Sequence, residues 1–173
     1  VCFVIDNLHR AGTELQLLKL IEHLDREKIL PHLCLLDGSE KDSKVLEPTG
    51  LPVFSLGVKR LCSYQAFQAA RRFRRYLKEH RIDLVQTYFN DSTRFAAPLA
   101  RSAGCLVFGS RRNLGHAMRG LDRFVARLYN RHFIDKMIVN SEAVRVAVIE
   151  QEKISPSDVI VIPNGIELEP FRS

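Results

Sequence analysis

The chain has 173 residues, and its content of 46% hydrophobic and 27% charged residues is typical of one globular domain rather than of a disordered or fibrous chain. The net charge of +6 favours anionic partners such as phosphates, nucleic acid or acidic lipid, without choosing between them. No apolar run approaches the roughly 20 residues that cross a bilayer, and the first residues are typical of a strand rather than of a signal peptide. The four widely spaced cysteines include no Cys-x-x-Cys pair, which argues against a zinc or redox motif and weakly favours a reducing cytoplasm.

Short apolar, β-branched runs alternate with segments of helical periodicity along the chain. This alternation predicts an α/β fold, a doubly wound, Rossmann-like sheet of about seven parallel strands joined by right-handed helical crossovers. The predicted strands are residues 1–6, 32–36, 53–56, 83–89, 106–110, 136–140 and 159–162. The predicted helices are residues 13–24, 66–80, 92–102, 121–133 and 142–150, and residues 37–44 are predicted to form a polar loop.

Two of these helices have a periodicity that also predicts which side chains face the core. The apolar face of helix 66–80 is made by Phe67, Ala70, Phe73 and Leu77. The inward face of helix 121–133 is predicted to comprise Leu121, Phe124, Val125, Leu128 and Tyr129. For the last helix, Ser141 is in position to cap the first turn.

Ligands of open parallel sheets bind beyond the carboxyl ends of the strands, where the strand order reverses. The first such loop has a single glycine, Gly12, beside the small Ala11, and then opens a helix whose amides would attract phosphate, although an ordinary turn explains the glycine equally well. Glu14 follows in the first helical turn, where the helix dipole alone favours a carboxylate. Neither a Gly-x-Gly-x-x-Gly nor a P-loop motif occurs, which argues against dinucleotide and P-loop sites.

A second loop places Asn90, Asp91 and Ser92 after an apolar strand, and N-capping by Asp91 or Ser92 is its simplest explanation.

A third loop gathers Arg111, Arg112, Asn113 and His116 beyond a strand end. Arginine suits bidentate contact with phosphate or carboxylate, although a solvated basic loop would have the same composition. His116 is a candidate acid, base or hydroxyl contact, with a structural role as the alternative.

Two helices also carry basic faces. One face consists of Arg119, Arg123, Arg127 and Arg131, and the other of Arg71, Arg72, Arg75 and Lys78. Such faces suit anionic lipid head groups, with a merely solvated surface as the alternative. Nucleic acid is not expected as a partner, because exposed aromatic residues are not interleaved with the arginines.

Four short motifs follow one another in a set order and together span nearly the whole chain. They are Ala11–Glu14 (AGTE), Ile82–Thr87 (IDLVQT), Val139–Val144 (VNSEAV) and Ile162–Ile166 (IPNGI) with Phe171. As an ordered set they resemble the amino-terminal domain of the retaining family-four (group 1) glycosyltransferases, which have the two-domain GT-B fold.

The resemblance implies an enzyme that moves a sugar from a nucleotide-sugar donor to a hydroxyl group of a glycan, lipid or other acceptor, with retention, as in cell-envelope polysaccharide or glycolipid synthesis. It implies no metal and no cofactor beyond the donor as co-substrate. The cysteines favour a cytoplasmic protein, and the basic faces would allow it to lie on the inner face of the membrane. Residues 1–168 would be the acceptor-side domain, and residues 169–173 would begin the linker to an absent carboxyl-terminal, donor-binding domain. This part alone is therefore expected to have negligible activity.

The resemblance also assigns roles to residues in the loops. The donor diphosphate loop would be Ala11, Gly12 and Thr13. The acceptor-side residues would be Asn90, Arg111, Arg112, Asn113 and His116. Ala11 stands where the family has a glycine, and Ser110–Asn113 stands where some members have a histidine near the anomeric carbon. The catalytic residue is therefore left unassigned, with His116 as a candidate that needs geometric support.

The residues by themselves leave one alternative open, a free-standing Rossmann-like module that binds an anion or a partner without catalysis. A second βα-alternating domain encoded after residue 173 would distinguish the enzyme from this module.

Overall fold

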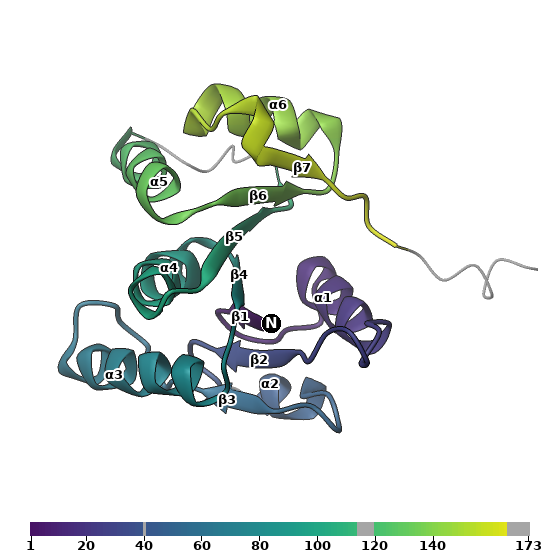
Figure 1. The fold of residues 1–173 in the computed structure, drawn as a ribbon, viewed down its shortest axis with the longest axis vertical. Helices are drawn as coiled ribbons and strands as arrows, with labels where there is room; N and C mark the ends of the chain where they lie inside the picture. The colour runs from purple at the N-terminus through teal and green to yellow at the C-terminus, as the bar shows by residue number, and fades with distance from the viewer. Residues whose placement is uncertain (40, 114–119, 166–173) are drawn as a thin grey trace, which may run out of the picture.

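The computed structural model describes residues 1–39, 41–113 and 120–165, and it contains all seven predicted strands. They form one parallel sheet in the order β3-β2-β1-β4-β5-β6-β7 (Figure 1). The strands are β1 (Cys2–Ile5), β2 (His32–Leu35), β3 (Val53–Ser55), β4 (Leu84–Tyr88), β5 (Leu106–Arg111), β6 (Lys136–Val139) and β7 (Val159–Val161). The order runs outward from β1 to β3 in one direction and from β4 to β7 in the other, so the winding reverses between β1 and β4.

Helices cover both faces of the sheet, which confirms the predicted doubly wound α/β class. The helices are α1 (Gly12–Glu22), α2 (Lys41–Leu46), α3 (Tyr64–Glu79), α4 (Asn90–Ala103), α5 (Gly120–Phe133) and α6 (Glu142–Glu152), followed by a 3-10 turn at Pro156–Asp158. One face carries α1 and α2, while α3, α4 and α5 lie side by side on the other face and α6 packs against α5 (Figure 1).

The central strands are buried on both faces, as their continuous apolar sequences predict. On the side of α3 and α4, Phe73 and Leu77 pack with strand residues such as Val4. On the side of α1, Leu17 and Ile21 pack with the other set of strand side chains. Cys2, Cys34 and Cys105 are buried and Cys62 is exposed, and none of the four forms a disulfide. Burial raises the pKa of the Cys2 thiol to about 12, which fits the structural role expected of it.

The prediction of a polar loop over residues 37–44 is wrong in its second half, because α2 begins at Lys41. A long-range contact explains this helix. The Ser43 side chain is fully buried, and its hydroxyl accepts the N–H of Leu8 at 3.0 Å and donates to the Leu8 carbonyl at 3.2 Å. The composition of the segment contains no sign of a partner that lies 35 residues earlier in the chain.

The predicted inward face of α5 is wrong for three of its five residues. Leu121, Phe124 and Leu128 are exposed, while Val125 and Tyr129 are half-buried. The side of α5 that faces the protein is completed by the buried Asn130. Periodicity located the helix but did not determine which of its stripes faces the sheet.

Two smaller corrections concern α3 and α4. Phe67 is exposed, and the buried positions of α3 are Ala66, Ala69, Phe73 and Leu77. Neither Asp91 nor Ser92 caps α4, because the helix starts at Asn90 behind Phe89. Ser141, in contrast, caps α6 as predicted by accepting the N–H of Val144 at 3.3 Å.

Candidate functional site

The loops selected from the sequence lie at one edge of the sheet. Ala11–Thr13 follows β1, Asn90 follows β4, and Arg111–Asn113 closes β5. These three strands are neighbours in the sheet, so their carboxyl ends are adjacent, and β1 and β4 flank the switch point. His116 lies outside the described residues, so its predicted role stays a prediction.

The N-terminus of α1 has no side-chain cap. Ala11 occupies the N-cap position with extended backbone angles (φ −116°, ψ 163°), and its methyl group cannot accept a hydrogen bond. At Gly12, an added Cβ would meet no other atom within 4 Å, so the helix begins beside open space. Uncapped amides and the positive end of a helix dipole together form a site that favours an anion.

The loop before α1 is fixed by hydrogen bonds to neighbouring segments. Leu8 is fully buried and is fixed by Ser43 of α2 through both of its backbone polar groups. The carbonyl of Asp6 accepts the N–H of Asp37 at 2.9 Å, which joins this loop to the end of β2. The loop that leads into the uncapped amides of α1 is therefore held in place by hydrogen bonds to α2 and to the end of β2.

Asp6 connects the two sides of the switch point. Its Oδ1 atom accepts the N–H of Ser92, in the first turn of α4, at 2.8 Å. Burial raises the pKa of Asp6, with smaller contributions in the same direction from Asp91 and Glu14. Burial therefore disfavours the ionised form of the Asp6 carboxylate. Its hydrogen bond nevertheless satisfies the Ser92 N–H, for which the N-cap residue of α4 offers no side-chain acceptor.

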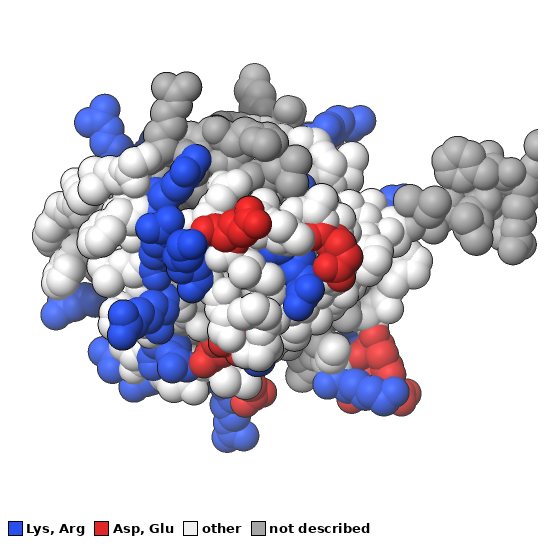
Figure 2. Space-filling model, turned by 90° about the horizontal axis from the view of Figure 1, so that it is seen from above, with Lys and Arg blue, Asp and Glu red and all other residues white. Residues whose placement is uncertain are grey.

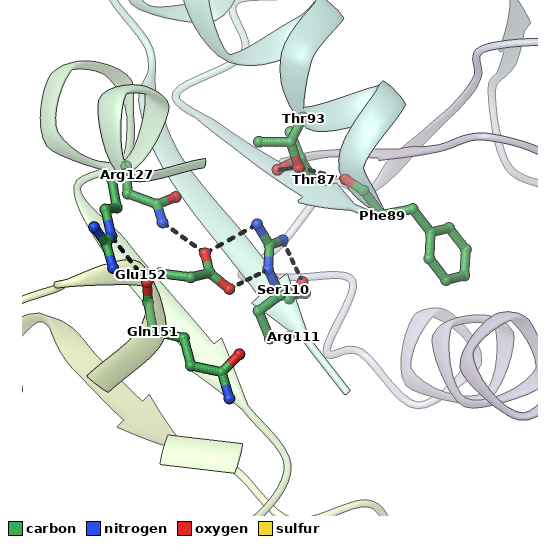
Figure 3. A network of polar contacts seen from close by, with 9 residues as sticks. Thr87, Phe89, Thr93, Ser110, Arg111, Arg127, Gln151 and Glu152 are labelled. Carbon is green, nitrogen blue, oxygen red and sulfur yellow. Dashed lines mark hydrogen bonds and ion pairs between the residues drawn. The ribbon is translucent and has the colours of Figure 1, made fainter. Parts of the chain in front are cut away.

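Phe89, between β4 and α4, has a backbone conformation that is essentially restricted to glycine (φ 66°, ψ 172°). Such a residue stores about 1–3 kcal/mol of strain and persists only where the surroundings fix it. The Thr93 hydroxyl donates to the Phe89 carbonyl at 2.6 Å and contacts the Thr87 hydroxyl at 3.0 Å, while the Phe89 ring projects away from this cluster (Figure 3). The sequence contained no sign of the strain, because no glycine marks the position.

Arg111 takes part in a buried network of polar contacts (Figure 3). Its Nε and Nη2 atoms donate to the two carboxylate oxygens of Glu152 at 2.9 and 3.2 Å, and its Nη1 donates to the Ser110 carbonyl at 3.2 Å. Asn130 donates to the same carboxylate at 2.6 Å. All three guanidinium nitrogens are therefore occupied within the protein. Glu152 and Asn130 were missed from the sequence because they lie on other helices, 41 and 19 residues away.

Arg112 joins the ends of several strands. Its Nη1 donates to Asn164 Oδ1 in the turn after β7, and its carbonyl accepts from Asn140 after β6 at 3.4 Å. Its guanidinium carbon lies 5.6 Å from the centre of the buried Tyr88 ring at the end of β4. Within the described residues, the buried Arg112 Nε and Asn140 Oδ1 atoms have no hydrogen-bond partner. Their hydrogen-bonding capacity is therefore not met by the described protein groups.

The remaining predicted residues are more accessible. Asn113 is exposed at the start of the loop that follows β5. Asn90 is half-buried and lines a narrow cleft between α4 and α5 together with Thr93 and Arg94. The edge of the sheet thus presents one open helix end at β1 and polar side chains beside it at β4 and β5.

The sequence matches the profile of Glycosyltransferase Family 4 over residues 10–170. No curated protein matches the sequence. Among solved structures, HepE from Anabaena in complex with UDP and glucose is similar at 17% identity with a TM-score of 0.77, covering 97% of this chain and 45% of that one. The lipopolysaccharide outer core galactosyltransferase WaaB is similar at 16% identity with a TM-score of 0.75, covering 96% of this chain and 46% of that one.

The fold alone does not define the chemistry. The UDP-GlcNAc 2-epimerase from Methanocaldococcus jannaschii is also similar, at 14% identity with a TM-score of 0.67, covering 95% of this chain and 46% of that one. At these identities the similarity establishes the Rossmann-like fold and nothing more. The chain spans less than half the length of each of these proteins.

Proposed function

The chain belongs to glycosyltransferase family 4, and from that premise we propose that it forms the amino-terminal, acceptor-side half of an enzyme that transfers a sugar from a nucleotide-sugar donor to a hydroxyl acceptor, with retention. The observation that carries the proposal is the uncapped N-terminus of α1 beside open space at the switch point. A site of this kind is suited to an anionic group that must approach the backbone closely.

The donor diphosphate is proposed to bind at Ala11–Thr13. When the bond between the sugar and the diphosphate breaks, negative charge develops on the departing phosphate oxygen. Backbone amides that already point toward this position stabilise the charge without having to reorganise, which lowers the barrier. The absence of a Cβ at Gly12 leaves room for the phosphate oxygens to come near the first-turn amides.

The acceptor is proposed to contact Asn90, Arg112 and Asn113. Their side chains lie at the ends of β4 and β5, beside the proposed diphosphate site. Arg111 is proposed to position this loop rather than to contact the acceptor, because Glu152 and the Ser110 carbonyl occupy its guanidinium. His116 stays the candidate for a group near the reacting carbon.

Catalysis by positioning requires both reactants to be held at the same time. We therefore propose that the rest of the protein binds the nucleotide and closes over this edge, and that these 173 residues alone give no measurable turnover. No metal or cofactor is required in this proposal.

Filling the open space at Gly12 tests the proposed donor site. In the complete protein, Gly12→Val is expected to weaken donor binding by about tenfold or more, with Gly12→Ala intermediate, because each added methyl group occupies space near the phosphates. Thermal unfolding should change little, since the new Cβ contacts nothing and Gly12 does not have a positive φ. Unchanged donor affinity in Gly12→Val would contradict the site, and donor binding without sugar transfer would favour a non-catalytic module.

A further inference from the structure

A pocket of about 470 Å³ lies between α5, α6 and the first residues of β6, and its volume is typical of small-molecule sites. Its walls come from the second half of α5, the turn into β6, the end of α6 and the segment that leads into β7. Since β6 begins at Lys136 and β7 at Val159, the pocket lies at the amino ends of the strands. It is therefore at the edge of the sheet opposite to the candidate functional site.

Three carboxylates line the pocket, and each of them already forms an ion pair. The pairs are Asp135 with Arg101 (2.8 Å), Glu152 with Arg111 (2.9 Å) and Asp158 with Lys136 (2.7 Å). Arg101 and Arg111 are not part of the lining, so they offset acidic charge without using a cation of the pocket. Among the described lining residues, Lys136 is the only cation that pairs with a carboxylate.

The other three cations of the lining, Arg127, Arg131 and Lys153, are exposed and form no ion pair within the described part of the chain. The Arg127 Nε atom donates to the Gln151 carbonyl at 3.0 Å (Figure 3), a neutral group that does not cancel its charge. The negative end of a helix dipole attracts a cation, but Arg127 lies more than a turn before the end of α5. Figure 2 looks onto the end of the molecule that carries α5, α6 and β7, and basic side chains form a column over it. This excess of positive charge suits an anionic ligand.

The interior of the pocket offers apolar surface and hydrogen-bonding groups. Met137 is fully buried, and Ile134 and Ile154 are half-buried. Asn130 donates an amide N–H to Glu152 at 2.6 Å, and its buried amide oxygen has no hydrogen-bond partner within the described residues. Buried acceptors without a donor are uncommon, and a hydroxyl group bound in the pocket would provide one.

We propose that this pocket binds a phosphorylated sugar. The three cations without an ion pair contact the phosphate group, which carries about two negative charges at neutral pH. The sugar hydroxyls bind Asn130 and the exposed Ser155 hydroxyl, while the C–H face of the ring lies on the apolar side chains. A nucleotide is disfavoured, because the described lining residues include no aromatic side chain on which its base could stack. The ligand is additional to the substrates, and its binding does not depend on the proposed transferase activity.

Calorimetric titration of the complete protein tests the proposal. Glucose 6-phosphate, fructose 6-phosphate and ribose 5-phosphate are the probes, and glucose and inorganic phosphate represent their two halves. At least one sugar phosphate is expected to bind about tenfold more tightly than either half alone, because the pocket recognises both groups. If inorganic phosphate binds as tightly as every sugar phosphate, the pocket is a general anion site and the proposal is overturned. The absence of binding by all three probes would overturn it as well.

Two charge-matched variants locate the binding. Replacing Arg131 and Lys153 by Gln together removes two of the three cations and is expected to weaken the affinity by about tenfold or more. Replacing Arg75 and Lys78 by Gln removes the same charge from an exposed face of α3 and should leave the affinity unchanged. All four side chains are exposed, so both variants without ligand should melt at the temperature of the wild type. An equal loss of affinity in the two variants would show that only net charge matters and would contradict the proposal.

Gly12→Val provides the remaining control, because a phosphate group could instead bind at the open end of α1. This variant is expected to bind the sugar phosphate with the affinity of the wild type, whether or not α1 binds the donor. A loss of sugar-phosphate binding in Gly12→Val would place the ligand at the candidate functional site rather than in the pocket between α5 and α6.

Discussion

The helices of this domain begin in two different ways. Helices α3 and α6 each start behind a serine whose hydroxyl accepts an N–H of the first turn. The distance is 3.1 Å for Ser63 and 3.3 Å for Ser141. Helices α1 and α4 start behind Ala11 and Phe89, which provide no side-chain cap. The uncapped pair begins on either side of the switch point. Among these four helices, the two that begin at the switch point lack the side-chain caps that α3 and α6 have.

The two uncapped ends also differ from each other. Asp6, which follows β1, accepts one N–H of α4. Burial raises the pKa of this carboxyl group. The end of α1 begins beside open space. This difference is the reason that we propose α1, rather than α4, as the place where an anionic ligand replaces a missing cap.

The largest expected effect lies at the other end of the capped helix α6. Glu152→Ala would leave the buried Arg111 without its carboxylate, which is expected to destabilise the fold by about 3–5 kcal/mol. Glu142→Ala, at the exposed start of the same helix, should cost less than about 1 kcal/mol. Urea unfolding of both variants measures the contrast, and a small effect for Glu152→Ala would contradict the burial of the Arg111–Glu152 ion pair drawn in Figure 3.

At the start of α4, the strain at Phe89 predicts that a glycine variant is more stable than an alanine variant, the reverse of the usual order. Glycine usually destabilises a protein relative to alanine by about 0.5–1 kcal/mol. At this position we expect Phe89→Gly to be more stable than Phe89→Ala by about 1 kcal/mol, because only glycine adopts the backbone conformation without strain. Both variants lose the same ring contacts, so their difference in free energy of unfolding isolates the backbone. The usual order would show that Phe89 is not strained.

Removing a serine cap should lower the free energy of unfolding, and adding a cap to α1 should raise it, each by less than the changes above. Ser63→Ala and Ser141→Ala should each cost about 1 kcal/mol, since each leaves a first-turn amide without its acceptor. Ala11→Ser should instead stabilise the protein by about 0.5 kcal/mol or more, because α1 gains the cap it lacks. Destabilisation by Ala11→Ser would indicate that the α1 amides are already satisfied.

The smallest expected effect is a pH dependence at Asp6. The pKa of Asp6 is raised on folding, so its contribution to stability is complete below the unfolded pKa of 3.8 and is lost as pH rises through the folded value. Asp6→Asn does not ionise, and its amide oxygen can still accept the Ser92 N–H. Its stability relative to the wild type should therefore increase from about pH 4 to about pH 7, while Asp91 and Glu14 titrate in both proteins. A constant or decreasing difference would contradict the burial of an ionised carboxylate.

The sequence predicted the parts of the fold that depend on local pattern. The continuous apolar run at Cys2–Ile5 identified a buried parallel strand, and Ser141 before a helical segment identified a cap. The alternation of elements was enough to predict the doubly wound sheet, and hence that the loops after β1, β4 and β5 share one edge.

What the sequence could not predict depends on contacts between distant residues. Helix α2 requires Ser43 to meet Leu8, and Arg111 lost its freedom to bind a ligand because Glu152 reached it from another helix. The orientation of α5 could not be derived from its periodicity, since periodicity does not determine whether an apolar stripe faces the core or, as Leu121, Phe124 and Leu128 do, the surface. The strain at Phe89 is a property of the backbone with no residue type to reveal it.

The most direct measurement compares donor binding in two charge-matched variants of the complete protein. Ala11→Asp and Ser63→Asp each place a carboxylate at the N-cap of a helix, one at the proposed diphosphate site and one at α3. With UDP, GDP and ADP as probes, the account predicts that Ala11→Asp weakens the affinity of whichever diphosphate the wild type binds by about tenfold or more, through repulsion, while Ser63→Asp leaves it unchanged. Equal affinities in the two variants would contradict the claim that the open end of α1 binds the donor diphosphate.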